Sequence, residues 1–405
     1  MNILLLCNKS PYPAFEGGPM AMNSIVSGLL NAGHKVKIMA VNSKKYNVSP
    51  EDIPEDYKQK TGIELINVDL RVRPLKAFKN LFSSKSYHVE RFISKDFTNR
   101  LIEVLKQETF DVVQLETLFM TPYVETIRKN SKAMIVLRAH NVEHLIWERM
   151  AKGTRFFLKR IYINHLARTL RNYELSAISQ VDGIAAITRK DAAYFRKYCA
   201  TTTIDIPYGV YPEEFHPNYE IEGKPTFYHI GSMNWMPNEE GIKWFIDNCL
   251  DAVVAKVPDF VFHLAGRNMP EWLKNYKNKH IDVIGEVPNA KEFVANHDVA
   301  IVPLLSGSGI RIKIIESMAL GKTVITTMVG AEGILYDEDI NIIIAENKAK
   351  MAEAIRRINE NPAMAEEIGK AARRLVEEVY DNRKITERLL MFYEQIKPSS
   401  KITFV

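Results

Sequence analysis

The stretch that decides the fold spans residues 306–334 and reads SGSGIRIKIIESMALGKTVITTMVGAEGI. It follows an apolar run, DVAIVPLL at residues 298–305, that predicts a buried strand. The helical pattern after the small residues ends at Gly321, and residues 323–327 predict the next strand. A strand, a glycine-rich turn and a helix start present backbone N–H groups to an anion, which predicts a phosphate site. An ordinary βαβ unit with a solvated, charged helix is the alternative that this segment leaves open.

Several side chains in this stretch suit a ligand that carries both phosphate and sugar. Arg311 and Lys313 place positive charge just after the turn, and arginine can bind phosphate through two N–H groups. Gly309 lets the backbone come close to a phosphate. Glu316, one helical turn further on, offers a carboxylate to sugar hydroxyls. Together they predict a nucleotide-sugar site.

Strands and helices alternate along both halves of the 405-residue chain, which predicts parallel sheets covered by helices on both faces. The predicted strands span residues 3–6, 35–41, 112–114, 134–138, 183–187, 227–230, 260–265, 281–284, 299–303 and 324–327. The predicted helices lie near residues 21–32, 96–107, 158–179, 238–257, 290–296, 351–359, 364–379 and 383–395. We therefore predict an α/β fold with two Rossmann-like domains, residues 1–205 and 226–382, joined by a Pro- and acid-rich linker at 206–225.

Composition restricts the setting of the protein. Hydrophobic residues make up 46% and charged residues 25% of the chain, as in ordinary globular proteins. The longest apolar runs fall short of the roughly 20 residues that a spanning helix needs, and the first residues lack the pattern of a signal peptide. The three cysteines are far apart, which argues against a zinc site or a disulfide framework. We expect a cytoplasmic protein without a bound metal.

Positive charge is concentrated in the first half of the chain. Residues 1–200 hold 31 Lys and Arg against 19 Asp and Glu, a net charge of +12, whereas the remaining residues carry −7. The excess lies in residues 71–92 and 152–171, where Lys and Arg alternate with apolar side chains at roughly helical spacing. This composition suits the surface of an anionic membrane, and equally two solvated helices packed on the core. No nucleic-acid-binding motif accompanies the charge, so we expect no nucleic acid partner.

Four regions of the chain resemble one family. EGGPMAMNSIVSGLLNAGHKVKIM, FDVVQLE with VLRAHNVEHLIWER, FYHIGSMNWMPNEEGIKWF, and GEVPNAKEFVANHDVAIVPLLSGSGIRIKIIESMALGKTVITTMVGAEGI occur in the order and spacing of the retaining group 1 glycosyltransferases of the GT-B fold (family 4). The branch it resembles most is associated with exopolysaccharide synthesis. Each motif alone is weakly specific, but together they cover nearly the whole chain.

The resemblance implies two Rossmann-like domains that face each other across a cleft. The nucleotide-sugar donor would bind the C-terminal domain, the acceptor would bind mainly the N-terminal domain, and the final helix, residues 383–397, would pack back on the first domain. It also implies transfer of a sugar with retention of configuration to a hydroxyl of a glycan or lipid-linked acceptor at the inner face of the membrane. The donor motif includes no aspartates set for a metal, so we expect metal independence, and no cofactor is expected besides the donor itself.

The resemblance assigns roles within the donor domain. Glu316 would bind the ribose, and Ser308 stands where the family has a second glutamate that touches the transferred sugar. Family members also carry cations just after Gly231, where this chain reads SMNWMPNEEG. We infer that Arg311 and Lys313 replace them. Gly285 and Val287 resemble the turn that recognises the base.

In the first domain, Gly17 and Gly18 precede a helix, where their backbone can approach the diphosphate or the acceptor. His140 follows a strand end and matches a family histidine that contacts the transferred sugar. Asn141 and Glu143 are expected to bind the acceptor. A plain turn and a structural histidine are the alternatives.

Two other functions stay open from the sequence. One is a GT-B epimerase that acts on a nucleotide sugar, and the other is a non-catalytic nucleotide-sugar-binding protein, because Ser308 replaces a family glutamate. If Arg311 stabilises the leaving diphosphate, its loss must cost far more turnover than loss of a surface arginine, for which Arg373 is our sequence-based choice.

Overall fold

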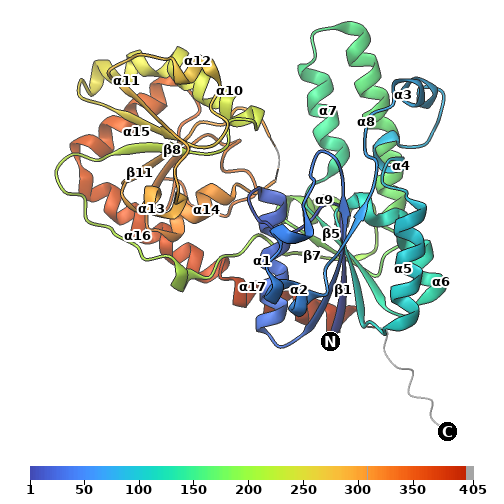
Figure 1. The fold of residues 1–405 in the computed structure, drawn as a ribbon. Helices are drawn as coiled ribbons and strands as arrows, with labels where there is room; N and C mark the ends of the chain where they lie inside the picture. Colours follow the sequence, from blue (N-terminus) through green and yellow to red (C-terminus); the bar gives the residue numbers. More distant parts are fainter. Residues whose placement is uncertain (308, 398–405) are drawn as a thin grey trace. The chain divides into compact units, whose positions relative to one another are not determined.

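The computed structural model describes residues 1–307 and 309–397. Its contacts divide the chain into unit 1, which comprises Met1–Tyr208 and the C-terminal segment from Asn382, and unit 2, Gly209–Asp381 (Figure 1). Each unit is a parallel β-sheet with helices packed against it. The predicted fold class, α/β with two Rossmann-like domains, is confirmed.

The sheet of unit 1 has seven parallel strands in the order β3-β2-β1-β4-β5-β6-β7. Its central strands are buried on both faces, as expected where helices cover both sides, and Ile3 to Cys7 of β1 are fully buried. The strands are β1 (Asn2–Cys7), β2 (Lys35–Asn42), β3 (Glu64–Asn67), β4 (Val112–Glu116), β5 (Met134–Ala139), β6 (Gly183–Ala186) and β7 (Thr202–Asp205).

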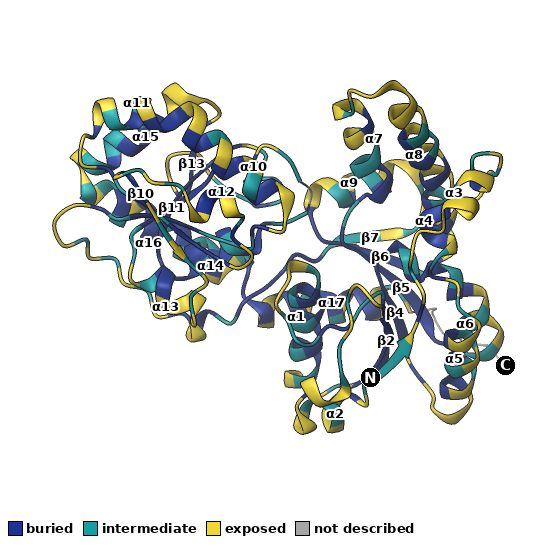
Figure 2. Cartoon of the chain, turned by 45° about the horizontal axis from the view of Figure 1, so that its top comes forward, coloured by how far each residue is buried: buried dark blue, intermediate teal, exposed yellow. Residues whose placement is uncertain are grey.

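Helices of unit 1 connect these strands. They are α1 (Gly17–Asn31), α2 (Glu55–Thr61), α3 (Pro74–Asn80), α4 (Tyr87–Glu90), α5 (Lys95–Gln107), α6 (Val124–Asn130), α7 (Glu143–Gly153), α8 (Phe157–Ala177), α9 (Arg189–Tyr198) and α17 (Asn382–Ile396), with short 3₁₀ turns at η1 (Pro50–Asp52) and η2 (Leu118–Tyr123). In Figure 2 the central strands of this sheet are mostly dark blue, whereas α3 and the turn between α7 and α8 show much exposed surface.

The last helix, α17, completes the core of unit 1. Its buried face, with Leu389 and Phe392, packs in one cluster with β1 and β2. The amide of Asn382 donates to the Ser24 carbonyl at 2.8 Å, which ties the start of α17 to α1. A Cβ on Gly28 of α1 would lie 2.0 Å from Thr386 Oγ1, so only glycine allows the two helices to come this close.

Unit 2 has a six-stranded parallel sheet in the order β10-β9-β8-β11-β12-β13. The strands are β8 (Phe227–Ile230), β9 (Phe262–Ala265), β10 (Ile281–Gly285), β11 (Val299–Val302), β12 (Thr323–Thr326) and β13 (Ile343–Ile344). The helices are α10 (Met236–Trp244), α11 (Leu250–Lys256), α12 (Glu271–Lys274), α13 (Ala290–Ala295), α14 (Ile312–Ala319), α15 (Lys348–Glu360) and α16 (Pro362–Val379), with a 3₁₀ turn η3 (Pro212–Glu214). A π-helical turn, η4 (Phe245–Cys249), joins α10 to α11.

Most of the stretch expected as a linker, residues 209–225, groups with unit 2. Arg373 of α16 holds it, because its guanidinium donates to the Phe215 carbonyl at 2.8 Å and to the Pro212 carbonyl at 2.9 Å. Only 11% of the Arg373 side chain is exposed. The expectation that Arg373 is a surface arginine is therefore wrong, and the exposed Arg374 is the better comparison.

Candidate functional site

The candidate donor site lies at the carboxyl edge of the unit 2 sheet. The strand order reverses between β8 and β11, so the loops that follow these strands diverge there. Such a switch point is where open α/β sheets bind ligands. The loop after β8 leads to α10, and the glycine-rich turn after β11 leads to α14. The fold thus places the stretch of residues 306–334 at this point of the sheet.

Arg311 is the residue that precedes α14, and only 4% of it is exposed. Its Nη1 donates to the Gly309 carbonyl at 2.7 Å, and its Cζ lies 5.5 Å from the ring centroid of Trp235. Gly307 and Gly309 both have positive φ, at 114° and 76°. A Cβ on Gly307 would lie 3.0 Å from Arg311 Nη2. The glycine-rich turn therefore makes room for the guanidinium and fixes it with a backbone carbonyl.

Lys313, in the first turn of α14, is half-buried between two polar side chains. Its Nζ lies 2.7 Å from Asn238 Oδ1 and 3.2 Å from His229 Nε2. Nδ1 of His229 lies 2.8 Å from the Ile301 carbonyl, which can only accept, so Nδ1 carries the proton and Nε2 accepts from the lysine. Burial and the nearby charge of Lys313 lower the pKa of His229 well below its usual value, so this histidine is neutral.

Burial and, to a lesser extent, the positive charge of Arg311 together lower the pKa of the Lys313 ammonium to about 7. Two cations and the start of a helix therefore lie together here without enough negative charge to hold the lysine fully protonated at neutral pH. An anionic group that binds between them would raise this pKa again. The arrangement is chemically suited to a phosphate or a diphosphate.

Gly231, the first residue after β8, is the point where Lys313 touches the loop. A Cβ at this position would lie 2.4 Å from Lys313 Nζ and 2.8 Å from Asn238 Nδ2. Gly266 is equally constrained, since its φ is 144° and a Cβ would lie 1.8 Å from the Gly231 carbonyl oxygen. The structure thus brings Lys313 to the position where the resemblance leads one to expect cations in the loop after Gly231.

The other residues predicted for the donor site lie at different positions in unit 2. Glu316 is half-buried on α14, one turn beyond Ile312, and Ser308 lies outside the described residues. Gly285 ends β10 with a φ of 84°, and Val287 follows two residues later. Since β10 is the outer strand, this turn lies two strands from the switch point.

In unit 1, the glycines predicted after the first strand open α1. Gly17 is its first residue, and a Cβ on Gly18 would lie 3.1 Å from Lys9 Cε. Lys9 Nζ pairs with Glu16 at 2.9 Å and lies 4.5 Å from the ring centroid of Tyr46. The loop after β1 therefore holds a lysine that the sequence did not single out.

His140 follows β5 and forms a buried network with three residues that the sequence analysis missed. Its Nε2 lies 2.7 Å from Glu116 Oε2, at the end of β4, and Arg138 Nη1 lies 3.4 Å from the same oxygen. Gln114 Nε2 donates to the other Glu116 oxygen at 2.6 Å. Because a carboxylate only accepts, His140 Nε2 must carry the proton, and Arg138 Nη1, at 3.1 Å from that nitrogen, donates no hydrogen bond to it.

The protonation states in this network follow from burial and charge. Burial acts to raise the pKa of Glu116, but the Arg138 charge and the hydrogen bonds from His140 and Gln114 outweigh it and lower this pKa. Burial lowers the pKa of His140, although Glu116 opposes the shift. Glu116 is thus ionised and fixes a neutral His140 in one tautomer. The Nδ1 atom of His140 is then an acceptor for a ligand hydroxyl.

Asn141 and Glu143 lie next to His140 at the start of α7. Glu143 is buried, and Asn141 Nδ2 lies 3.4 Å from its Oε1. Burial, together with the charge of Glu174, raises the pKa of Glu143 to about 8. Glu174 itself accepts from the Glu143 backbone N–H at 2.9 Å and pairs with His144 Nδ1 at 2.6 Å. A protonated Glu143 can donate a hydrogen bond at neutral pH.

Two negative observations apply to the described residues. Among residues 1–307 and 309–397, no group of three or more His, Cys, Asp or Glu side chains is arranged to hold a metal ion. Within the same part of the chain, every helix is too short or too polar to cross a bilayer.

Comparisons with known proteins agree with this fold. Residues 224–361 match the family model for glycosyl transferases of group 1, and this segment contains Gly231, Arg311, Lys313 and Glu316. A 44.6 kDa uncharacterised protein in the cps region of Klebsiella pneumoniae is 23% identical over 409 residues, which cover 95% of this chain and 97% of the relative.

Solved structures share the fold across both units. HepE of Anabaena in complex with UDP has a TM-score of 0.67 at 12% identity and covers 98% of this chain and 100% of its own. Sucrose-phosphate synthase from Thermosynechococcus elongatus has a TM-score of 0.68 at 16% identity over 98% of this chain and 99% of its own. TarM of S. aureus, in complex with Fondaparinux, alpha-GlcNAc-glycerol and UDP, has a TM-score of 0.67 at 13% identity over 97% and 100%.

Residues 224–361 are therefore a group 1 glycosyl transferase domain, and the chain has the GT-B fold. The resemblance that the sequence showed to this family is confirmed.

Proposed function

We propose that this group 1 glycosyl transferase moves a sugar from a nucleotide diphosphate sugar to a hydroxyl of a glycan or lipid-linked acceptor, with retention of configuration, in surface polysaccharide synthesis. One observation carries the proposal. Arg311 and Lys313 lie at the start of α14, beside the switch point of the unit 2 sheet. Because Gly231 has no side chain, the lysine amine has room beside the loop after β8. This is a charge distribution for a diphosphate.

In the proposed mechanism, the two cations stabilise the nucleotide diphosphate as it leaves. The bond from the sugar to the diphosphate breaks, the electron pair stays on the diphosphate, and the acceptor hydroxyl attacks from the same face. The leaving diphosphate takes the acceptor proton, so the enzyme supplies no nucleophile. Arg311 is positioned in advance by Gly309 and Trp235, which means that little reorganisation accompanies the charge development.

We assign the remaining residues as follows. Glu316 binds the ribose, and Gly285 and Val287 approach the base. In unit 1, His140 accepts from a hydroxyl of the transferred sugar through Nδ1, because Glu116 holds the proton on Nε2. Glu143 and Asn141 bind the acceptor.

The relatives support the choice of substrates. Structures of HepE hold UDP and UDP-glucose, and the TarM structure holds UDP together with alpha-GlcNAc-glycerol. The relative from the cps region of Klebsiella pneumoniae supports a role in polysaccharide synthesis. A UDP-sugar is therefore the first donor to test, and we propose transfer without a metal ion because Arg311 and Lys313 supply the positive charge.

A thermal-shift screen with UDP-, GDP-, ADP- and dTDP-sugars tests the donor site. One nucleotide class should raise the melting temperature of the wild type and of the Arg374→Ala control, since a ligand of the native state stabilises by mass action. Arg311→Ala should lose most of this shift. Equal shifts in both variants would reject Arg311 as a donor ligand, and no shift with any nucleotide would reject the proposed function.

A further inference from the structure

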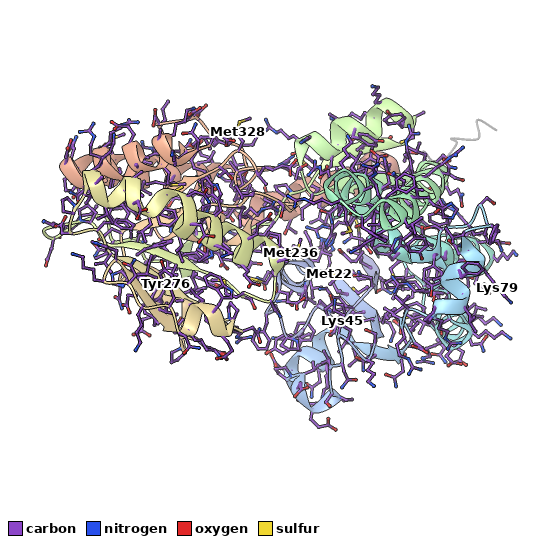
Figure 3. All side chains as sticks on the ribbon, turned by 90° about the horizontal axis from the view of Figure 1, so that it is seen from above. Met22, Lys45, Lys79, Met236, Tyr276 and Met328 are labelled. Atoms are coloured by element: carbon purple, nitrogen blue, oxygen red, sulfur yellow. The ribbon has the colours of Figure 1, made fainter. Side chains whose placement is uncertain are left out.

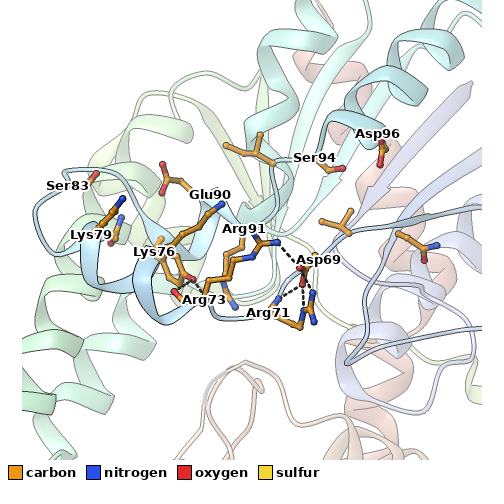
Figure 4. Close-up of a pocket in the computed structure, with 15 residues that line it drawn as sticks. Asp69, Arg71, Arg73, Lys76, Lys79, Ser83, Glu90, Arg91, Ser94 and Asp96 are labelled. Atoms are coloured by element: carbon orange, nitrogen blue, oxygen red, sulfur yellow. Dashed lines mark hydrogen bonds and ion pairs between the residues drawn. The ribbon is translucent and has the colours of Figure 1, made fainter.

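Unit 1 contains a cavity of about 800 Å³ that the proposed transfer reaction does not use (Figure 4). It is lined by the loop after β3, by α3, and by the segment from α4 to the start of α5. Five cations and three carboxylates contribute to its wall: Arg71, Arg73, Lys76, Lys79 and Arg91 against Asp69, Glu90 and Asp96. Among the described residues that line it, none is assigned to the donor or the acceptor.

The carboxylate at the centre of Figure 4 is shared by two arginines. Asp69 accepts from Nε and Nη2 of Arg71, both at 2.9 Å, and from Nη2 of Arg73 at 3.0 Å. The hydrogen bonds from Arg71, with that from Arg73, hold the pKa of Asp69 well below its usual value. One negative charge thus orients two guanidinium groups in the wall, and the wall keeps an excess of positive charge.

Arg91 adds a cation that the protein itself does not neutralise. Its Nη1 donates to the Leu70 carbonyl at 2.9 Å, and its Cζ lies 5.6 Å from the ring centroid of Tyr87. Among the described residues, no carboxylate pairs with Arg91, and its buried Nε lacks a hydrogen-bond partner. A half-buried cation without a counter-ion is unfavourable, so the cavity favours an anionic ligand.

An apolar rim lies beside this basic cavity. Leu75, Phe78 and Phe82 occupy positions i, i+3 and i+7 on and just after α3, and they are 80%, 62% and 84% exposed. The rings of Phe78 and Phe82 are 5.8 Å apart. Val72 and Ile93 are also exposed. Large side chains gathered in this way on a surface mark a place of contact with an apolar partner.

The start of α8 extends the same kind of surface. Figures 1 and 2 both show α3 beside α8, and His165 Nε2 lies 3.0 Å from the Asn80 carbonyl. Phe156, Phe157 and Leu158, at the turn into α8, are each more than half exposed. Phe156, Phe157 and Leu158 belong to the basic stretch at residues 152–171, and α3 belongs to the one at residues 71–92. Lys79 of α3 is labelled in Figure 3.

We propose that this cavity binds the phosphate head group of an anionic phospholipid while the apolar rim enters the bilayer, so that unit 1 docks on an anionic membrane. A soluble anion would neutralise the cations but would leave Leu75, Phe78 and Phe82 in water. A neutral membrane would cover the rim but would leave Arg91 without a counter-ion. An amphiphile with an anionic head accounts for both features.

Vesicle co-sedimentation of the full chain tests this proposal. Wild type should bind vesicles that contain phosphatidylglycerol and should bind poorly to phosphatidylcholine alone. Lys76→Ala with Lys79→Ala should weaken binding about 25-fold, because each basic residue near an anionic surface contributes about fivefold. The matched control is Lys129→Ala with Lys132→Ala, two exposed lysines that precede the first residue of β5 and do not line the cavity. It should bind like the wild type.

Two further arms separate the lipid from other ligands. Phe78→Ser with Phe82→Ser should weaken vesicle binding while leaving every charge in place. Inorganic phosphate at matched ionic strength should displace no more protein than chloride. Absence of vesicle binding, equal losses in the cavity and control variants, or displacement by phosphate alone would each overturn the proposal. The thermal shift with a nucleotide sugar should persist in all these variants, so failure here is distinguishable from failure of the proposed transfer.

Discussion

The titration of Lys313 provides a test of the donor site that no surface lysine can imitate. In the free protein its pKa is lowered to about 7, first by burial and then by Arg311. A diphosphate binds the protonated amine, so donor binding must draw in a proton wherever the free lysine is neutral. Because the lowered pKa belongs to the free protein, affinity is highest below pH 7 and decreases as the pH rises above it.

The expected magnitude follows from this linkage. At pH 9, two units above the pKa, about 1% of the free protein carries a charged Lys313, and affinity should be about 100-fold lower than at pH 6, or about 2.7 kcal/mol. This holds while the pKa in the complex stays above 9. At pH 7, binding should take up about half a proton.

Titration calorimetry measures both quantities. The nucleotide sugar found in the screen, UDP-glucose first, is titrated between pH 6 and 9 in buffers of different ionisation enthalpy. Its diphosphate is esterified at both ends and does not titrate in this range. Lys313→Met should bind weakly with no dependence on pH, whereas Lys350→Met, at an exposed position of α15, should behave as the wild type. A wild-type affinity that is flat from pH 7 to 9 would refute the reasoning.

Three further predictions follow from close contacts in the structure. Gly231→Ala should displace the Lys313 amine, which lies 2.4 Å from the new Cβ, and weaken donor binding about tenfold. The free energy of unfolding should change by less than about 1 kcal/mol, because the flexible end of the lysine side chain gives way. Calorimetry and urea unfolding of the same sample check both parts, and a large loss of stability would contradict the prediction. Glu116→Gln should lower kcat about 100-fold, because it weakens the hydrogen-bond acceptor that fixes the His140 tautomer. The thermal shift with the donor nucleotide should persist. An unchanged kcat would remove His140 from the mechanism. Gly28→Ala should lower the free energy of unfolding in urea by about 1–3 kcal/mol, because its Cβ overlaps Thr386 Oγ1. Adding Thr386→Ala to this variant should restore part of the loss. If it restores none, the contact is not the cause.

The sequence predicted the strands whose residues are buried on both faces. Residues 3–6 and 299–303 are examples, because burial on both sides of a parallel sheet demands a continuous apolar run. The strands of unit 1 that were missed, β3 (Glu64–Asn67) and β7 (Thr202–Asp205), are the two edges of its sheet. They are short and polar because an edge strand is only partly covered. Periodicity alone does not distinguish them from loops.

The site was predicted less completely, because contacts across strands depend on register. The register of β4 and β5 sets Glu116 opposite Arg138, and this pairing places the carboxylate within reach of His140. The sequence gives only a hint, an acidic residue at the end of the apolar run FDVVQLE. His229 was missed for the same reason, since a histidine on an apolar strand, two residues before a glycine, has no pattern that reveals Lys313 as its neighbour.

The return of α17 to the first sheet has a consequence for how the chain acquires its structure during synthesis. The core of unit 1 needs Leu389 and Phe392, which leave the ribosome after all of Gly209–Asp381. Unit 2 is continuous and can fold as soon as it emerges, whereas the sheet that is made first keeps part of one apolar face uncovered until α17 has been synthesised. A fragment that stops after β7 should therefore aggregate, while residues 209–381 alone should express as a folded domain.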